Sequence, residues 1–202
     1  MKLNLSVGQM YPWVDYVTNP LAGRCVHLCR YCYMFSKRGI ANRFKLKKYE
    51  GNPRIDYKVL YSPFGKVKRT RRENVSCVPE NSVIVFLCSA TDLLASNVPS
   101  RMISEILREC RKRPDIYWLI QSKNPIRFLE FEDELPPRRI LGTTLETNRD
   151  EIVKEISLAP PPSRRFKNFL LVRKRIDALY MISVEPIMAC DPEILSSWIK
   201  KI

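Results

Sequence analysis

The sequence predicts an α/β fold built on a mainly parallel β-sheet, and two observations support this prediction. From Val83 onward, short runs of β-branched and apolar residues alternate with segments of helical periodicity, the pattern of repeated strand–helix–strand units. The chain has 202 residues, of which 45% are hydrophobic, so it can bury a core without disulfide bonds. Connections between parallel strands are right-handed, and the resulting sheet is either open or curled into a barrel.

Five segments are predicted to form the strands of this sheet. They are short and rich in Val, Ile, Leu and aromatic residues, as strands buried on both faces are. The first is expected just before Cys25, and the others span residues 83–87, 116–120, 139–144 and 178–184.

The best-defined helix is predicted for residues 100–113. Its apolar residues fall at positions i, i+3, i+4 and i+7, which places them on one buried face. They are Ile103, Ile106, Leu107 and Cys110, and Pro114 follows as the stop. A shorter helix is expected at residues 126–131.

Three further helices are expected, each with a start signal. Asn148 is expected to cap one helix, with Glu151 in the capping-box position, and Ser163 to cap the next. The last helix is expected to open at Asp191-Pro192, because Pro is favoured at the first helical position.

The composition excludes several kinds of protein. A single histidine excludes metal sites built from several imidazoles, and six glycines leave no GxGxxG or Walker loop. No apolar run approaches the roughly 20 residues of a membrane helix, and the N-terminus lacks the apolar stretch of a signal peptide. We therefore expect no membrane partner and a cytoplasmic location.

The net charge of +14 is concentrated in one segment. Residues 37–72 hold 13 Lys or Arg but only two acidic residues, Glu50 and Asp56. Aromatic residues are interleaved with these cations, a composition that suits contact with the phosphates and bases of DNA or RNA. The alternative is a basic insertion, residues 37–80, that is merely solvated. The residues expected to contact nucleic acid are Lys45, Lys47, Lys48, Lys66, Lys68, Arg69, Arg71 and Arg72.

Polar residues follow the ends of the predicted strands. The carboxyl ends of parallel strands share one edge of the sheet, where ligands bind in such folds. Capping explains Asn148 but not Lys123, Glu146 or Glu185, which favours a functional role for these three. The polar residues expected at this edge are Ser89, Thr91, Asp92, Gln121, Ser122, Lys123, Thr144, Glu146, Thr147, Asn148, Ser183 and Glu185.

Three cysteines form the most specific motif. Cys25, Cys29 and Cys32 have the spacing C-x3-C-x2-C, and thiolates on one short loop can reach three corners of an iron–sulfur cube while leaving one iron open. The alternatives are unligated cysteines and a structural zinc site whose fourth ligand is His27 or Cys77. A second cluster would use Cys77, Cys88 and Cys190.

With Tyr31 before its last cysteine, this motif resembles the C-x3-C-x-aromatic-C signature of the radical S-adenosylmethionine (radical SAM) superfamily. The resemblance implies a partial (β/α) barrel of radical SAM type with parallel strands, here lacking the sixth strand. It implies a [4Fe-4S] cluster on the three cysteines, S-adenosylmethionine on the open iron, and an electron donor such as ferredoxin or flavodoxin. Cleavage of S-adenosylmethionine would then give a 5′-deoxyadenosyl radical that abstracts hydrogen from a substrate.

Other segments resemble the phage and archaeal radical-SAM-like family often called Gp37/Gp68 (DUF5131-type). A shorter stretch, Cys-Arg-Tyr-Cys-Tyr at residues 29–33, is similar to spore-photoproduct-lyase-like proteins, which repair or bind DNA. The segments that carry the first resemblance are Tyr11-Pro12-Trp13, Asn19-Pro20, Leu94 with Val98-Pro99, and residues 121–125, 142–147 and 183–186.

By position, the resemblance assigns cofactor or substrate contacts to several of the residues already singled out. Tyr31 would lie near the adenine, and Glu146 and Asn148 would contact the ribose or the methionine part. Residues 89–91 occupy a segment that is usually Gly-rich in the superfamily but has no glycine here. The implied cofactor-binding residues are Tyr31, Ser89, Thr91, Gln121, Lys123, Glu146, Asn148 and Glu185.

The leading expectation is a single domain, residues 1–202, that acts as a radical SAM enzyme on a nucleic acid or nucleobase. The basic segment would cover the barrel mouth and grip the substrate. One alternative is a non-catalytic iron–sulfur or zinc protein that binds nucleic acid. Another is a radical SAM enzyme for a peptide or a small metabolite.

Overall fold

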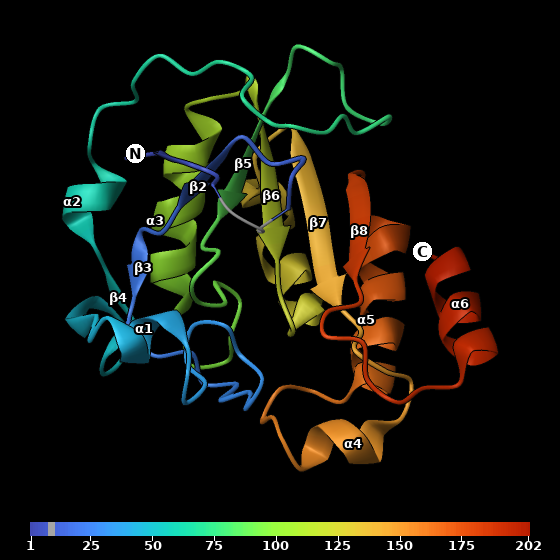
Figure 1. The fold of residues 1–202 in the computed structure, drawn as a ribbon. Helices are drawn as coiled ribbons and strands as arrows, with labels where there is room; N and C mark the ends of the chain where they lie inside the picture. Colours follow the sequence, from blue (N-terminus) through green and yellow to red (C-terminus); the bar gives the residue numbers. More distant parts are fainter. Residues whose placement is uncertain (8–10) are drawn as a thin grey trace.

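A six-stranded sheet forms the centre of the computed structural model, which describes residues 1–7 and 11–202 (Figure 1). The strand order is β1-β2-β5-β6-β7-β8; β1 pairs antiparallel with β2, and every later pair is parallel. The strands are β1 (Asn4–Leu5), β2 (Tyr16–Thr18), β5 (Val83–Leu87), β6 (Ile116–Gln121), β7 (Arg139–Thr144) and β8 (Leu179–Ser183).

The parallel part of the sheet confirms four of the five predicted strands. The strand just before Cys25, β3 (Leu21–Ala22), instead pairs antiparallel with β4 (Arg54–Ile55) in a separate two-stranded sheet, and β2 is the neighbour of β5. β5 and β7 have the predicted bounds, and β6 and β8 differ only at their ends. The sheet does not close into a barrel: within residues 1–7 and 11–202, β1 and β8 remain its two edges. The fold is therefore an open, mostly parallel α/β sheet.

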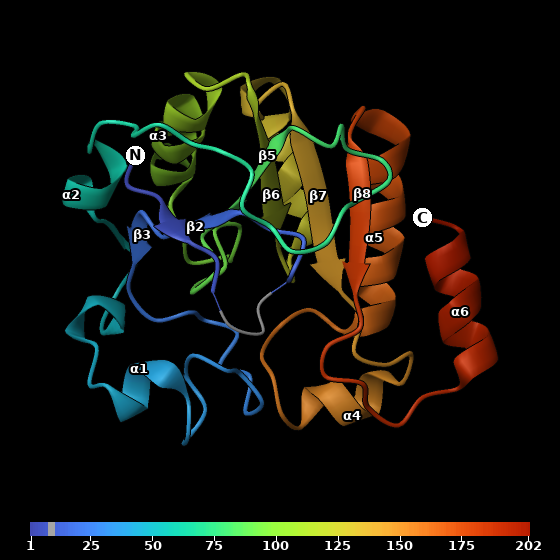
Figure 2. The same cartoon turned by 45° about the horizontal axis from the view of Figure 1, so that its top comes forward.

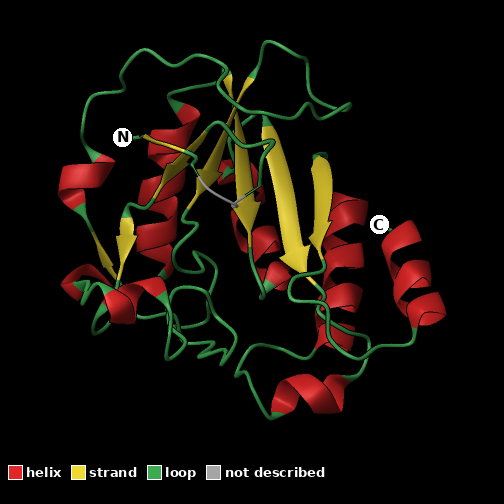
Figure 3. Cartoon of the chain, viewed as in Figure 1, coloured by secondary structure: helices red, strands yellow, loops and turns green. Residues whose placement is uncertain are grey.

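Alternation along the strands gives the sheet two apolar faces. Val83, Val85 and Leu87 of β5 point to one face, and Ile84 and Phe86 point to the other. The first face packs on a helical layer (Figure 3). This layer consists of α3 (Ser100–Arg111), η2 (Pro125–Glu134) and α5 (Pro162–Arg175), and the predicted face of α3 is buried as expected.

Irregular chain covers the opposite face. Val14, just before β2, and Val78 are buried there against the side chains of β5 to β7. Tyr11 stacks on Trp13, with ring centroids 5.2 Å apart, and packs against the same cluster. This face is thus closed by loops rather than by helices.

The segment of residues 61–82 crosses the amino-terminal ends of the strands (Figure 2). Asp15 anchors it, because the Asp15 carboxylate accepts hydrogen bonds from the backbone N–H groups of Arg71 (2.7 Å) and Ile84 (2.8 Å). The Arg71 guanidinium forms a fully buried ion pair with Asp15 at 3.0 Å and donates to the carbonyl of Glu80 at 2.7 Å. Half of the basic insertion therefore lies at the amino end of the sheet.

The remaining elements are short, and several gather at the other end. Figure 1 shows α1 and α4 at the end toward which the arrows of β7 and β8 point. Among the described residues, no helix has the length and apolarity that a membrane crossing requires. These elements are β3 (Leu21–Ala22), α1 (Ile40–Arg43), η1 (Lys47–Tyr49), β4 (Arg54–Ile55), α2 (Tyr57–Leu60), α4 (Asp150–Lys154) and α6 (Pro192–Lys200).

Two predicted helix caps are wrong. Asn148 does not cap α4; its amide donates to the Asp191 carboxylate (3.0 Å) and accepts from the Asp191 backbone N–H (2.8 Å). Ser163 lies inside α5, which begins one residue earlier at Pro162, and its hydroxyl donates to Asp150 at 2.6 Å. In both cases a partner distant in sequence replaces the local backbone as the hydrogen-bonding group.

Candidate functional site

The cysteine loop, residues 25–32, lies at the carboxyl end of the sheet. The segment after α4 holds it there: the Arg30 N–H donates to the Ile156 carbonyl at 2.8 Å, and the Leu158 N–H donates to the His27 carbonyl at 2.7 Å. Gly23, just before the loop, has a φ of +98° and lies directly against the backbone of Asn52. A side chain at position 23 would collide there, so only glycine allows this close approach.

Cys25 and Cys32 each lie close enough to Cys29 to interact with it electrostatically. Burial is the main reason that the pKa of Cys25 rises to about 12 and that the pKa of Cys32 is also raised, and the neighbouring Cys29 adds a smaller contribution to both shifts. Cys29 is buried, and its Sγ lies 3.0 Å from the Ser157 hydroxyl. In the described ranges, no three His, Cys, Asp or Glu side chains are arranged to hold a metal ion. The free loop thus carries protonated thiols at Cys25 and Cys32.

Asp92 ties the cysteine loop to the sheet. Its Oδ2 accepts hydrogen bonds from His27 Nε2 (2.8 Å), the Ser122 hydroxyl (3.0 Å) and the Lys123 N–H (2.8 Å). Burial by itself would raise the pKa of Asp92, but His27, Ser122 and the Lys123 N–H outweigh burial and lower it. An ionised carboxylate therefore joins the loop to the segments that follow β5 and β6.

Glu146, after β7, is the centre of a buried polar network. Its carboxylate is fully buried, pairs with Lys123 and with Arg165 of α5 (2.7 Å), and accepts a hydrogen bond from the Tyr31 hydroxyl at 2.6 Å. Burial alone would raise the pKa of Glu146, but the two cations outweigh it and lower the pKa to about 2. Burial and the Glu146 charge raise the pKa of Tyr31, so its phenol stays protonated and donates. The predicted residues Tyr31, Lys123 and Glu146 are thus in direct contact.

Gln121 belongs to a neighbouring hydrogen-bonded chain. It accepts from the Tyr11 hydroxyl at 3.0 Å and donates to the Thr144 hydroxyl at 2.9 Å. This chain lies at the ends of β6 and β7, the edge at which the site was predicted.

The other predicted cofactor residues stand apart from the Glu146 network. Ser89 is hydrogen-bonded to Asn19 (3.3 Å), and Thr91 is buried. Asn148 is used by Asp191, as described above, and Glu185 is exposed in the loop after β8. The network therefore gathers three of the eight.

The cysteines outside the loop are dispersed. Cys77 is exposed in the segment at the amino end, Cys88 is buried after β5, and Cys110 is buried in α3. Cys190 lies between β8 and α6. This placement argues against the predicted second cluster and against Cys77 as a fourth zinc ligand.

The eight basic residues predicted to contact nucleic acid do not form one surface. Arg71 is buried with Asp15, so its assignment as a contact is wrong. Lys48 is half-buried and pairs with Asp56 at 2.7 Å. Lys45 follows α1 and Lys47 opens η1, and both are exposed, whereas Lys66, Lys68, Arg69 and Arg72 lie in the segment of residues 61–82 at the amino end. The prediction that the whole basic segment covers the site is therefore wrong for the part that lies at the amino end of the sheet.

The aromatic residues interleaved with these cations differ in exposure, so they do not form one stacking surface. Tyr49 is buried, and the Phe64 ring packs edge-on against Trp118 at 6.4 Å. Tyr57 and Tyr61 are exposed and stack on each other at 5.7 Å.

Two contacts of the candidate site were not predicted from the sequence. Arg165 is one of several cations in α5, and nothing in the local sequence marks it as the buried partner of Glu146. His27 was noted only as a zinc ligand; its pairing with Asp92 spans 65 positions in the sequence. The only available signal was the strand-end position of Asp92.

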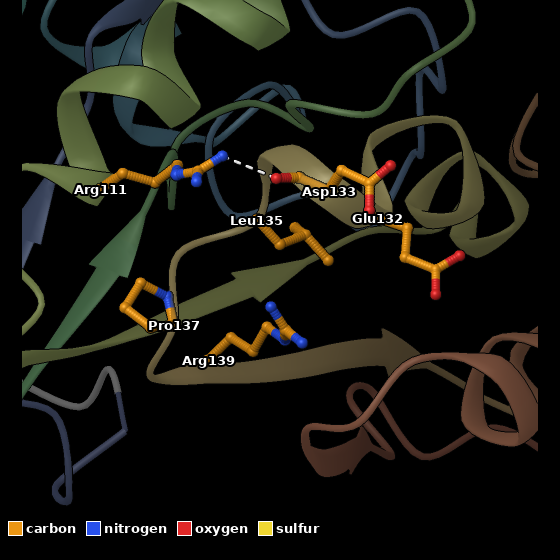
Figure 4. A pocket seen from close by; sticks show the side chains of 6 residues that line it. All are labelled: Arg111, Glu132, Asp133, Leu135, Pro137 and Arg139. Carbon is orange, nitrogen blue, oxygen red and sulfur yellow. Dashed lines mark hydrogen bonds between the residues drawn. The ribbon is translucent and has the colours of Figure 1, made fainter.

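A shallow depression of about 500 Å³ lies at the amino end of the sheet, near the start of β7 (Figure 4). The Arg111 guanidinium donates to the Asp133 carbonyl across it at 2.6 Å. No cysteine of the loop contributes to it, so it is not the site. It is lined by Arg111, Glu132, Asp133, Leu135, Pro137 and Arg139.

Comparison with protein families matches residues 9–188 to the family described as "Protein of unknown function (DUF5131)". Neither the curated proteins nor the solved structures include a match to this chain. The matched range contains the cysteine loop, the Glu146 network and strands β2 to β8. This chain therefore belongs to the DUF5131 family.

Proposed function

We propose that this protein is a radical SAM enzyme that holds a [4Fe-4S] cluster with Cys25, Cys29 and Cys32. The observation that carries the proposal is the position of the C-x3-C-x-Tyr-C loop. It lies at the carboxyl edge of a parallel sheet, where ligands bind in such folds, and Tyr31 within it touches the buried Glu146 network.

The donors present suit such a cluster. Three thiols lie within eight residues, and residues 25–32 contain no carboxylate that would favour a hard cation. When bound, the cluster would supply the electron that cleaves S-adenosylmethionine to methionine and a 5′-deoxyadenosyl radical. A four-ligand zinc site is less well supported, because Cys77 lies at the opposite end of the sheet.

The residues around the loop can bind and orient S-adenosylmethionine. Lys123 is the cation of the Glu146 network whose side chain is not fully buried, being 18% exposed, whereas that of Arg165 has no exposed surface. We assign it to the carboxylate of the methionine part. The Lys123 amine also lies 5.2 Å from the centroid of the Tyr31 ring, which offers an aromatic face to the adenine. Glu146 holds both side chains in place because it contacts each of them, and Arg165 in turn fixes Glu146.

The test is anaerobic reconstitution of the full chain with iron and sulfide. We expect bound iron and sulfide in the ratio of a [4Fe-4S] cluster, with its visible absorbance bleached by dithionite. Addition of S-adenosylmethionine should then yield 5′-deoxyadenosine. Cys29→Ser should lose the bound iron and the product, whereas Cys77→Ser, the matched exposed cysteine outside the loop, should keep both.

Two outcomes would overturn the proposal. One is a fully loaded cluster that yields no 5′-deoxyadenosine above the level of the Cys29→Ser variant. The other is equal iron loading of the wild-type chain and Cys29→Ser, which would separate the metal from the loop.

A further inference from the structure

We infer that the surface around the cysteine loop binds single-stranded nucleic acid, which the enzyme would use as its substrate. That the nucleic acid is a substrate rests on the proposed function, whereas its binding does not. The surface is named here the basic collar and consists of Arg24, Arg30, Lys37, Arg38, Arg43, Lys45 and Lys47.

The basic collar is a dense and uncompensated set of charges. Residues 24–47 contain these seven cations and no Asp or Glu, and all seven side chains are exposed. In the described part of the chain, none of them forms an ion pair with an acidic side chain. A row of exposed cations with no internal partner is suited to phosphates, whose neutralisation releases counterions.

Packing places the basic collar at the site. The segment that bears most of it is folded onto the loop through a small apolar cluster in which Met34, Ala41, Tyr49 and Ala90 are buried and Cys32 is in contact. The backbone of α1 is also tied to the residues after Cys32, since the Ala41 N–H donates to the Met34 carbonyl at 2.9 Å. The apolar side of this segment thus faces the loop, and its cations face solvent next to the proposed cluster.

Exposed aromatic rings lie among these cations and select the kind of partner. Phe44, between Arg43 and Lys45, is 62% exposed, and the Arg43 guanidinium lies 5.3 Å from its ring centroid. Tyr33, directly after Cys32, is 44% exposed. An acidic protein partner would contact the cations but would not need the exposed aromatic rings. Unpaired bases can in addition stack on Phe44 and Tyr33, which a duplex cannot do.

The test measures binding of the full chain to a fluorescently labelled single-stranded DNA of about 15 nucleotides by anisotropy at several salt concentrations. One variant reverses three collar charges: Arg38→Glu, Arg43→Glu and Lys47→Glu. The matched control carries the same charge change at the amino end of the sheet: Lys66→Glu, Lys68→Glu and Lys174→Glu. Thermal unfolding of each variant confirms that it is folded.

We expect the collar variant to bind at least about tenfold more weakly, and its log–log salt slope to fall by about 2, as for three lost phosphate contacts. The control should stay within about threefold of the wild-type chain. Phe44→Ala should weaken binding by about tenfold with an unchanged salt slope, because it removes stacking and no charge.

Three results would overturn the inference. The first is an equal loss in the collar and control variants, and the second is tighter binding of the corresponding duplex. The third is the absence of strand binding together with collar-dependent binding of an acidic flavodoxin-type donor. Strand binding by a chain that yields no 5′-deoxyadenosine would instead overturn the proposed function and leave the basic collar as a binding surface.

Discussion

Both ends of the sheet carry basic segments, but the structure uses them differently. At the amino end, Arg71 is buried against Asp15, and Arg69 donates to the Asn74 side chain. At the carboxyl end, the basic collar is exposed and has no acidic partner among the described residues. The difference shows that charge density in a sequence does not reveal what a cation does: Asp15 buries Arg71, whereas Lys66 and Lys68 of the same segment stay exposed.

The buried ion pairs at the two ends also differ in how far their side chains are exposed. Asp15 and Arg71 both have side chains with no exposed surface, and they join the segment of residues 61–82 to β2 and β5. Glu146 is equally buried, but its partner Lys123 reaches the surface. The Asp15–Arg71 pair is closed off from solvent, whereas Lys123 of the second pair stays accessible, as the proposed function requires.

The largest effect is expected at the amino end. Arg71→Met should lower the free energy of unfolding by about 3–5 kcal/mol, because it leaves the Asp15 carboxylate buried without its counter-charge. Urea unfolding at neutral pH measures this, with Lys68→Met as a control that should change stability by less than about 0.5 kcal/mol. Equal stabilities of the two variants would remove the contrast between buried and exposed cations.

A slightly smaller effect is expected from the Glu146 network, and it depends on pH. The folded-state pKa of about 2 lies below the unfolded value of roughly 4.3, so folding favours the ionised carboxylate. The resulting stability, about 3 kcal/mol, is present above about pH 5 and is lost as the pH falls toward 2. Urea unfolding between pH 7 and pH 3 should therefore show a flatter pH dependence in Glu146→Gln. If the free energy of unfolding changes equally with pH in the wild-type chain and in Glu146→Gln, the lowered pKa of Glu146 is contradicted.

The smallest effect on stability is expected at the basic collar. The combined change Arg38→Glu, Arg43→Glu and Lys47→Glu should alter the free energy of unfolding by less than about 1 kcal/mol, because exposed side chains without partners add little to the fold. A slight gain is consistent with relief of like-charge repulsion. A loss comparable to that of Arg71→Met would make the collar a structural element.

Much of the fold was predictable because its signals are local. β5 and β7 have the predicted bounds, since a short run rich in Val and Ile such as Val83–Leu87 favours a strand buried on both faces. The parallel arrangement follows from the helices between the strands, and it brings Lys123 and Glu146 to one edge. The three cysteines were singled out by their spacing, and Tyr31 by the resemblance to the C-x3-C-x-aromatic-C signature.

What the sequence determined by itself is therefore the strands and helices from Val83 onward, the cysteine loop and the edge of the sheet at which polar groups gather. Only the tertiary structure decided which charges are paired. Arg165 meets Glu146 and Arg71 meets Asp15 across separations of 19 and 56 residues. Asn148 turns to Asp191 rather than to its own helix. The physical reason is that periodicity reports on neighbours along one element, whereas an ion pair depends on the path of the whole chain.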